Sequence, residues 1–97
     1  MRAPYNEFEW DKDNSGKNLK LHGVSDSEIE QVFENPNIVI PHKRHEDRRI
    51  VLGTTNGGKC LFLSIQHKTK TKCRPIHARL MEPDETQIYN KQVKQEE

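Results

Sequence analysis

The sequence predicts an α+β fold with a mostly antiparallel sheet, two helices before the main strands and one helix after them. Three observations carry this prediction. A capping-box pattern followed by an apolar stripe marks a helix close to residue 30. After it, the apolar residues fall into short β-branched runs that polar turns separate. A proline followed by two acidic residues then marks the start of a last helix at Pro83.

The N-terminal segment combines a short strand with a weak helix signal. Residues 8–11, Phe-Glu-Trp-Asp, are typical of a strand that ends at a helix-capping aspartate. We expect that helix over residues 12–22, with Gly23 as its stop, although its first turn has poor helix propensity. Trp10 and His22 would then share a polar helix face with the two asparagines between them, because all four are spaced by four.

The second helix has the clearest signals in the chain. Ser25 and Glu28 form a capping box, and Asn35-Pro36 ends the helix. Its apolar stripe consists of Ile29, Val32 and Phe33. This stripe predicts that one face of the helix covers the sheet.

Four strands and a last helix follow. The expected strands are residues 38–40, 49–52, 61–65 and 73–80. A charged loop at 42–47, a hairpin turn at Asn56-Gly57-Gly58 and a polar turn at 67–72 separate them. The last helix is expected over residues 83–94.

The last strand contains an internal proline, Pro75, which predicts an edge position or a bulge. Regular alternation places two sets of side chains on opposite faces of this strand. One set is Ile76, Ala78 and Leu80, and the other is Cys73, His77 and Arg79.

Length and composition predict one domain over residues 1–97, with an ordered core over about 6–92. The sequence has no apolar stretch long enough to span a bilayer and does not open with a signal peptide. We therefore expect no membrane partner and a cytoplasmic location. Two cysteines, Cys60 and Cys73, fit a reducing compartment and are too few for a disulfide framework.

The formal net charge of +1 conceals a segregation of charge. Residues 42–79 contain ten lysines and arginines but only two acidic residues, and the flanking segments are acidic. A polyanion such as RNA is the natural partner of a basic segment. The alternative is a solvated, charged sheet face without a partner.

His22 and the arginines are the residues most suited to chemistry. An imidazole can act as general acid or base, and a guanidinium can bind a phosphate through two parallel hydrogen bonds. Arg48 or Arg49 and Arg79 lie at strand ends and could meet on one sheet face. The alternative uses are a helix C-cap for His22 and ion pairs for the arginines. The acidic residues available for such pairs are Glu46, Asp47, Glu82 and Glu85.

A metal site is the competing kind of site. Its possible ligands are His42, His45, Cys60, His67, Cys73 and His77. Their spacing matches no zinc motif, and a hairpin that turns near residue 69 does not bring Cys60 opposite Cys73. We therefore expect neither a metal nor another cofactor.

Several short motifs also follow a familiar order. The first are Phe8-Glu9-Trp10-Asp11, Asn18, His22-Gly23-Val24-Ser25, Glu28, Val32-Phe33 and Asn35-Pro36. The later ones are Arg48, five residues before Gly53, then Gly58, Arg74, Ile76, Ala78-Arg79, Glu85 and Tyr89. Over residues 8–90 this combination resembles the BrnT family, the toxins of type II toxin–antitoxin pairs.

The resemblance implies a RelE-like fold and a metal-independent endoribonuclease that cleaves RNA and arrests translation. A BrnA-like antitoxin would neutralise the toxin in a hetero-oligomer, and DNA would be contacted only indirectly, through that antitoxin. The catalytic positions implied are His22, Arg48 or Arg49, and Arg79. The RNA-binding residues we expect are Trp10, Lys59, Arg74, His77 and Tyr89.

Two positions near this site depart from the family pattern. The family usually has a lysine or arginine where this chain has Leu21, and a small residue where it has His77. Loss of the basic residue could lower activity, and the added histidine could compensate or change specificity. The alternative function is therefore a non-catalytic corepressor module that acts only with a DNA-binding antitoxin.

Overall fold

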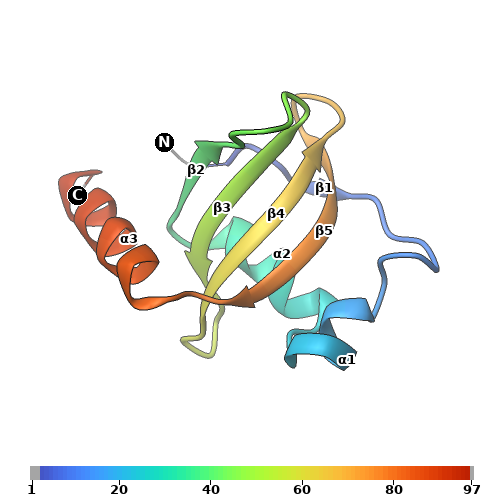
Figure 1. Ribbon diagram of the computed structural model, residues 1–97, viewed down its shortest axis with the longest axis horizontal. Helices are drawn as coiled ribbons and strands as arrows, with labels where there is room; N and C mark the ends of the chain where they lie inside the picture. Colours follow the sequence, from blue (N-terminus) through green and yellow to red (C-terminus); the bar gives the residue numbers. More distant parts are fainter. Residues whose placement is uncertain (1–2, 97) are drawn as a thin grey trace.

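A computed structural model describes residues 3–96. Its elements are β1 (Glu7–Phe8), α1 (Lys17–His22), α2 (Asp26–Glu34), β2 (Asn37–Pro41), β3 (Arg48–Thr54), β4 (Cys60–His67), β5 (Lys72–Leu80) and α3 (Pro83–Glu96). The strands form one sheet in the order β1-β5-β4-β3-β2 (Figure 1). β1 pairs with β5 in parallel, and the other pairs are antiparallel. The predicted α+β class and order of elements are confirmed.

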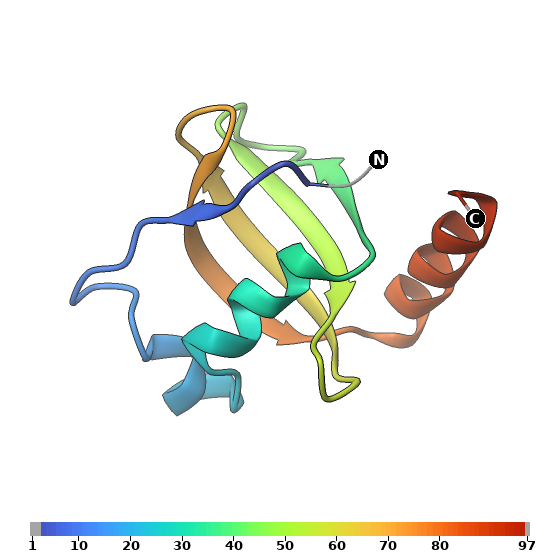
Figure 2. The ribbon, with the colours of Figure 1, turned by 180° about the vertical axis from the view of Figure 1, so that it is seen from behind.

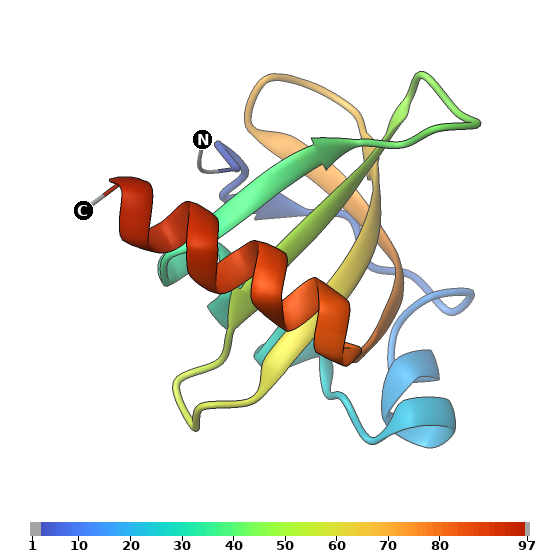
Figure 3. The ribbon, with the colours of Figure 1, turned by 60° about the vertical axis from the view of Figure 1, so that its left-hand side comes forward.

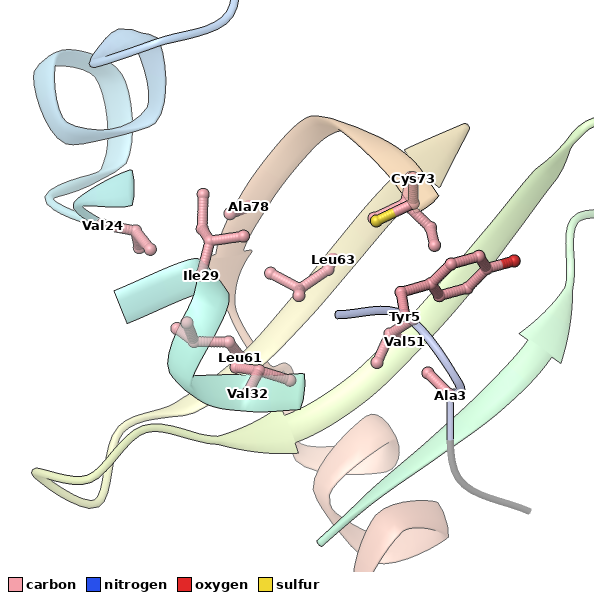
Figure 4. Close-up of a cluster of buried hydrophobic side chains, with 11 residues drawn as sticks. Ala3, Tyr5, Val24, Ile29, Val32, Val51, Leu61, Leu63, Cys73 and Ala78 are labelled. Carbon is pink, nitrogen blue, oxygen red and sulfur yellow. The ribbon is translucent and has the colours of Figure 1, made fainter. Parts of the chain in front are cut away.

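Helix α2 covers one face of the sheet (Figure 2). The predicted capping box is present, because Ser25 Oγ accepts from the Glu28 amide and Glu28 Oε1 accepts from the Ser25 amide. Below the helix lies the first core (Figure 4), which consists of Ala3, Tyr5, Val24, Ile29, Val32, Val51, Leu61, Leu63, Ile65, Cys73 and Ala78. The helix approaches β3 so closely that a Cβ on Gly53 would lie 2.6 Å from Val32 Cγ1.

Helix α3 packs on the opposite face, against β2 and β3 (Figure 3). A second core forms there around Ile38, Leu52 and Tyr89, with Phe62 at its margin. No helix in residues 3–96 lies over β4 and β5 on this face, as Figure 1 shows. The sheet is therefore covered on one face and only partly covered on the other.

The first helix is shorter than the sequence predicts. It begins at Lys17, because residues 11–14 form a turn in which Asp11 accepts from the amides of Asp13 and Asn14. Gly16 then adopts a left-handed conformation (φ 72°) that separates the turn from the helix. The shared helix face predicted for Trp10 and His22 is therefore wrong.

The predicted C-terminal stop of α1 is confirmed. Gly23 has φ 73° and its amide donates to the carbonyl of Leu19. The expected strand over residues 8–11 is reduced to Glu7–Phe8.

Strand β5 contains the bulge that Pro75 predicts. Its register shifts so that Ser64 pairs with His77 while Ile65 pairs with Pro75, which leaves Ile76 without a partner. The extra residue corrects the predicted alternation, because Cys73 now faces the first core together with Ala78. Burial there raises the pKa of the Cys73 thiol to about 12.

None of the helices in residues 3–96 combines the length and apolar character needed to cross a membrane.

Candidate functional site

The uncovered part of the sheet carries a row of polar side chains, which we call the open face. Its members are Arg48, Ser64, Gln66, Arg74, His77 and Arg79. Directly opposed residues of neighbouring strands share a face, so the register identifies them. Gln66 pairs with both Arg48 and Arg74, and Ser64 pairs with His77. Arg79 pairs with Phe62, at the margin of the second core.

The register also separates the two arginines that the sequence could not distinguish. Arg49 pairs with Ile65, which is fully buried in the first core, so Arg49 faces the other side of the sheet. Its guanidinium donates to the backbone carbonyls of Glu46 and Arg48. Arg48 is therefore the member of this pair that lies on the open face.

His22 and His77 meet at one end of the open face. Their ring centroids are 4.8 Å apart and the rings are nearly perpendicular, at 88°. His22 is the last residue of α1, and Asn18 of the same helix accepts a 3.0 Å hydrogen bond from the Ala78 amide, next to His77. This buried contact attaches α1 to the β5 edge and brings the two imidazoles together.

His77 is half-buried and lies among positive groups. Burial lowers the pKa of His77, and the charges of His22, Arg79 and Lys17 lower it further. The environment therefore favours a neutral imidazole at His77.

Arg79 is held firmly on two sides. Its guanidinium carbon lies 4.0 Å from the centroid of the Phe62 ring. Glu85 accepts from Nη1 at 2.8 Å and from Nη2 at 2.9 Å, and the carbonyl of Leu80 accepts a third bond from Nη1. The hydrogen bond from Arg79 lowers the pKa of Glu85, and the same bond raises the pKa of Arg79.

One edge of the Arg79 guanidinium makes no hydrogen bond, although the exposed Glu82 carboxylate lies 3.7 Å from Nη2. Its Nε–H and second Nη2–H make no hydrogen bond with any residue in the described range 3–96. These two donors are parallel and match two oxygens of a phosphate. Arg79 can therefore bind an anion without releasing Glu85.

The other two arginines of the open face differ from each other. Arg48 forms no ion pair with residues 3–96, and its buried Nε finds no hydrogen-bond acceptor among them. Arg74 is bound by Asp11 at 2.6 Å and by Glu9 at 3.2 Å. The hydrogen bond from Arg74 lowers the pKa of Asp11 to about 2, so the charge of Arg74 is balanced at neutral pH.

Three further residues that we expected to bind RNA lie outside the open face. Trp10 packs at the first core and donates from Nε1 to Glu30 at 2.7 Å. Lys59, in the β3–β4 hairpin, forms a 2.8 Å ion pair with Glu28. Tyr89, on the sheet-facing side of α3, is buried in the second core, where its hydroxyl donates to the carbonyl of Pro36.

Sequence reasoning did not single out Phe62 or Gln66. The signal that could have found them is the alternation along residues 61–66. Leu61, Leu63 and Ile65 face the first core, so Phe62 and Gln66 face the other side of the sheet.

In the part of the chain that the structure describes, no three His, Cys, Asp or Glu residues gather closely enough to hold a metal ion. Cys73 pairs with His67, at the opposite end of β4 from Cys60.

Comparison with known proteins identifies the family. The family model described as the ribonuclease toxin BrnT of type II toxin–antitoxin systems matches residues 10–85. A search among curated proteins finds no match. The matched range includes the two histidines in contact and ends at the carboxylate that holds Arg79. The chain belongs to the BrnT family of type II toxin–antitoxin ribonuclease toxins.

Proposed function

We propose that this chain is a metal-independent endoribonuclease toxin that cleaves RNA on its open face and arrests translation. The observation that carries the proposal is the unused donor edge of Arg79, two residues from the contact between His22 and His77. Alternate residues of a strand lie about 7 Å apart on one face, so a single phosphodiester can reach both groups. Membership of the ribonuclease toxin family supports the same activity.

The proposed chemistry uses the RNA 2′-hydroxyl as the nucleophile. Its oxygen attacks the adjacent phosphorus, the bond from phosphorus to the 5′-oxygen breaks, and a 2′,3′-cyclic phosphate and a 5′-hydroxyl remain. His22 acts as general acid or base in this step. Arg79 donates both free N–H groups to the non-bridging oxygens, where negative charge increases in the transition state.

Arg48 lies too far away to bind the same phosphate as Arg79. The two residues are two strands and four positions apart, which corresponds to about 16 Å between their Cα atoms. We assign Arg48 to a neighbouring phosphate of the same RNA strand, with Arg74 beside it. Substitution of Arg48 should then weaken RNA binding more than the chemical step.

The proposal extends to the fold and the partners. We infer a RelE-like arrangement from the twisted sheet with α2 on one face and α3 partly on the other. Membership of a type II toxin–antitoxin family implies an antitoxin partner. We propose a BrnA-like protein that forms a cytoplasmic hetero-oligomer with this chain and carries the contact with DNA.

One observation favours a second function, that of a non-catalytic corepressor subunit. Leu21, beside His22, is 61% exposed and puts an apolar side chain where the family usually has a basic one. An uncharged side chain at this position cannot attract an RNA phosphate, which favours a function that does not require RNA binding beside His22.

Cleavage of labelled RNA by the purified chain in excess chelator tests the two functions. We expect products that end in a 2′,3′-cyclic phosphate, and a loss of about 10²-fold or more in rate for His22→Ala and Arg79→Ala. His45→Ala is the matched control, because His45 is exposed in the loop between β2 and β3. Absence of cleavage by the wild type, or full activity of both variants, would refute the ribonuclease proposal.

Expression of the chain alone in a bacterial host separates the alternatives further. A ribonuclease toxin should arrest growth, and His22→Ala should relieve the arrest. A corepressor subunit should be tolerated as wild type.

A further inference from the structure

We propose that His77 is a second catalytic residue of this site and works with His22 as a two-imidazole acid–base pair. The inference rests on the proposed ribonuclease function and deepens it. It concerns a position at which the resemblance to the family predicts a small residue and not a catalytic one.

The reaction requires two proton transfers at different atoms. One proton leaves the 2′-hydroxyl as its oxygen bonds to phosphorus, and another reaches the 5′-oxygen as its bond to phosphorus breaks. A single imidazole would have to serve both atoms, on opposite sides of the phosphorus. Two imidazoles 4.8 Å apart can divide the two transfers between them.

The contact between the rings leaves their nitrogens available. The rings meet nearly at right angles, at 88°, and no hydrogen bond joins them. Neither ring forms a side-chain hydrogen bond with another residue in the described range 3–96, in contrast to His67, whose Nδ1 is bound to the Tyr5 hydroxyl at 2.6 Å. The pair is therefore free to bind substrate, whereas His67 is occupied within the fold.

The surroundings of His77 suit it to the role of base. The charged and titratable groups that face it are His22 and Lys17 from α1 and Arg79 from β5, while β4 contributes the uncharged Ser64. Burial and these positive groups lower the pKa of His77, so it is neutral and able to accept a proton near pH 7.

The two histidines exchange protons with opposite sides of the scissile phosphate. A nitrogen of neutral His77 takes the proton of the 2′-hydroxyl while the bond from O2′ to phosphorus forms. The bond from phosphorus to O5′ breaks, and protonated His22 gives its proton to O5′. Exchange of protons with water then returns both histidines to their starting forms.

Two RNA substrates distinguish the roles. The first is an ordinary RNA, and the second has sulfur in place of the bridging 5′-oxygen, so that the leaving thiolate needs no proton. On the ordinary RNA, we expect His77→Ala and His22→Ala each to lose about 10²-fold or more in kcat/KM. On the sulfur RNA, His22→Ala should recover most of the wild-type rate and His77→Ala should not.

The pH dependence gives a second readout that a merely structural role would not change. The wild type should show a bell-shaped profile of kcat/KM, and His77→Ala should lose the rise on its acidic side. His45→Ala should keep both limbs of the profile. His77→Gln, with circular dichroism on each variant, repeats the test if the alanine variant folds poorly.

The assignment is overturned if His77→Ala and His77→Gln keep the wild-type rate and both limbs. It is equally overturned if the sulfur RNA restores both histidine variants, because His77 would then not act as base. If the chain is not a ribonuclease, the wild type itself will cleave neither RNA. This outcome is distinct from the two above, and it would refute the assignment of His77 as well.

Discussion

The two faces of the sheet are made by the same strands but have opposite properties. On the face under α2, Val51, Leu61, Leu63 and Ile65 are at most 1% exposed. On the open face, the β4 residues Ser64 and Gln66, which follow Leu63 and Ile65 along the chain, are only partly buried. The comparison teaches that the covered face supplies the stability and leaves the open face free to hold polar groups that contribute little to it.

The largest expected effect comes from two adjacent residues on opposite faces. Leu63→Ala should lower the free energy of unfolding by about 3 kcal/mol, because it leaves a cavity in the first core. Ser64→Ala, one residue further along β4, should change it by less than about 0.5 kcal/mol. Urea denaturation of both variants measures the difference. Equal losses of unfolding free energy would contradict the conclusion that the covered face supplies most of the stability.

A second effect concerns how closely α2 lies on the covered face. Gly53→Ala should destabilise the protein by about 1–3 kcal/mol, because the new Cβ would be 2.6 Å from Val32 Cγ1 and 3.0 Å from Asn37 Cβ. Gly57→Ala, in the hairpin turn, is the control, since its Cβ would lie 3.9 Å from Thr55 Oγ1, an ordinary van der Waals distance. Thermal unfolding of the two variants should show a lower Tm for Gly53→Ala alone.

On the open face, the ion pair of Arg79 gives a smaller effect. Glu85→Gln should cost about 1 kcal/mol at pH 7. The pKa of Glu85 is lowered in the folded state, so this stabilisation is present above its ordinary pKa and is lost as the pH falls through the lowered value. Urea denaturation at several pH values should show wild type and variant converging in acid.

Glu82→Gln is the matched control for this ion pair. Its carboxylate is 3.7 Å from Arg79 Nη2 and 66% exposed, so its contribution should be close to zero. A loss equal to that of Glu85→Gln would show that proximity, and not the paired hydrogen bonds, accounts for the effect.

The smallest expected effect is the dependence of stability on the protonation of His77. Its pKa is lowered below the ordinary value of 6.5 in the folded state, so the unfolded chain binds this proton more readily. Stability should therefore rise with pH between the lowered value and 6.5, and His77→Gln should lose part of this rise. A variant with the wild-type pH dependence would contradict the pKa shift.

The parts of the fold with local signals were predictable from the sequence. The capping box of Ser25 and Glu28 and the stop at Gly23 depend on residues close together in the chain, and both are confirmed. The start of α1 was not predictable, because Asp11 uses its capping oxygen in a turn and Gly16 begins the helix later. An aspartate can accept backbone hydrogen bonds at a helix N-terminus or in a turn, so its presence alone does not show where the helix begins.

The site was less predictable because it depends on register. Arg48 and Arg49 are neighbours, and a shift of one residue would exchange their faces. The pairing of β3 with β4 determines which of the two arginines lies on the open face, and the sequence of either strand alone does not determine that pairing. The bulge at Ile76 has the same origin, since Pro75 indicates an irregularity without showing which side chains change face.

The way in which Phe62 and Glu85 hold Arg79 has a consequence for how a phosphate is attracted and bound. A side chain fixed in advance loses little rotamer freedom on binding, and for a free arginine that loss is about 0.5–1.5 kcal/mol. The carboxylate that fixes it also cancels most of its charge, which weakens its attraction for phosphate at long range. Arg79 therefore adds little to the long-range attraction of RNA, and the salt dependence of RNA affinity should come more from Arg48 than from Arg79.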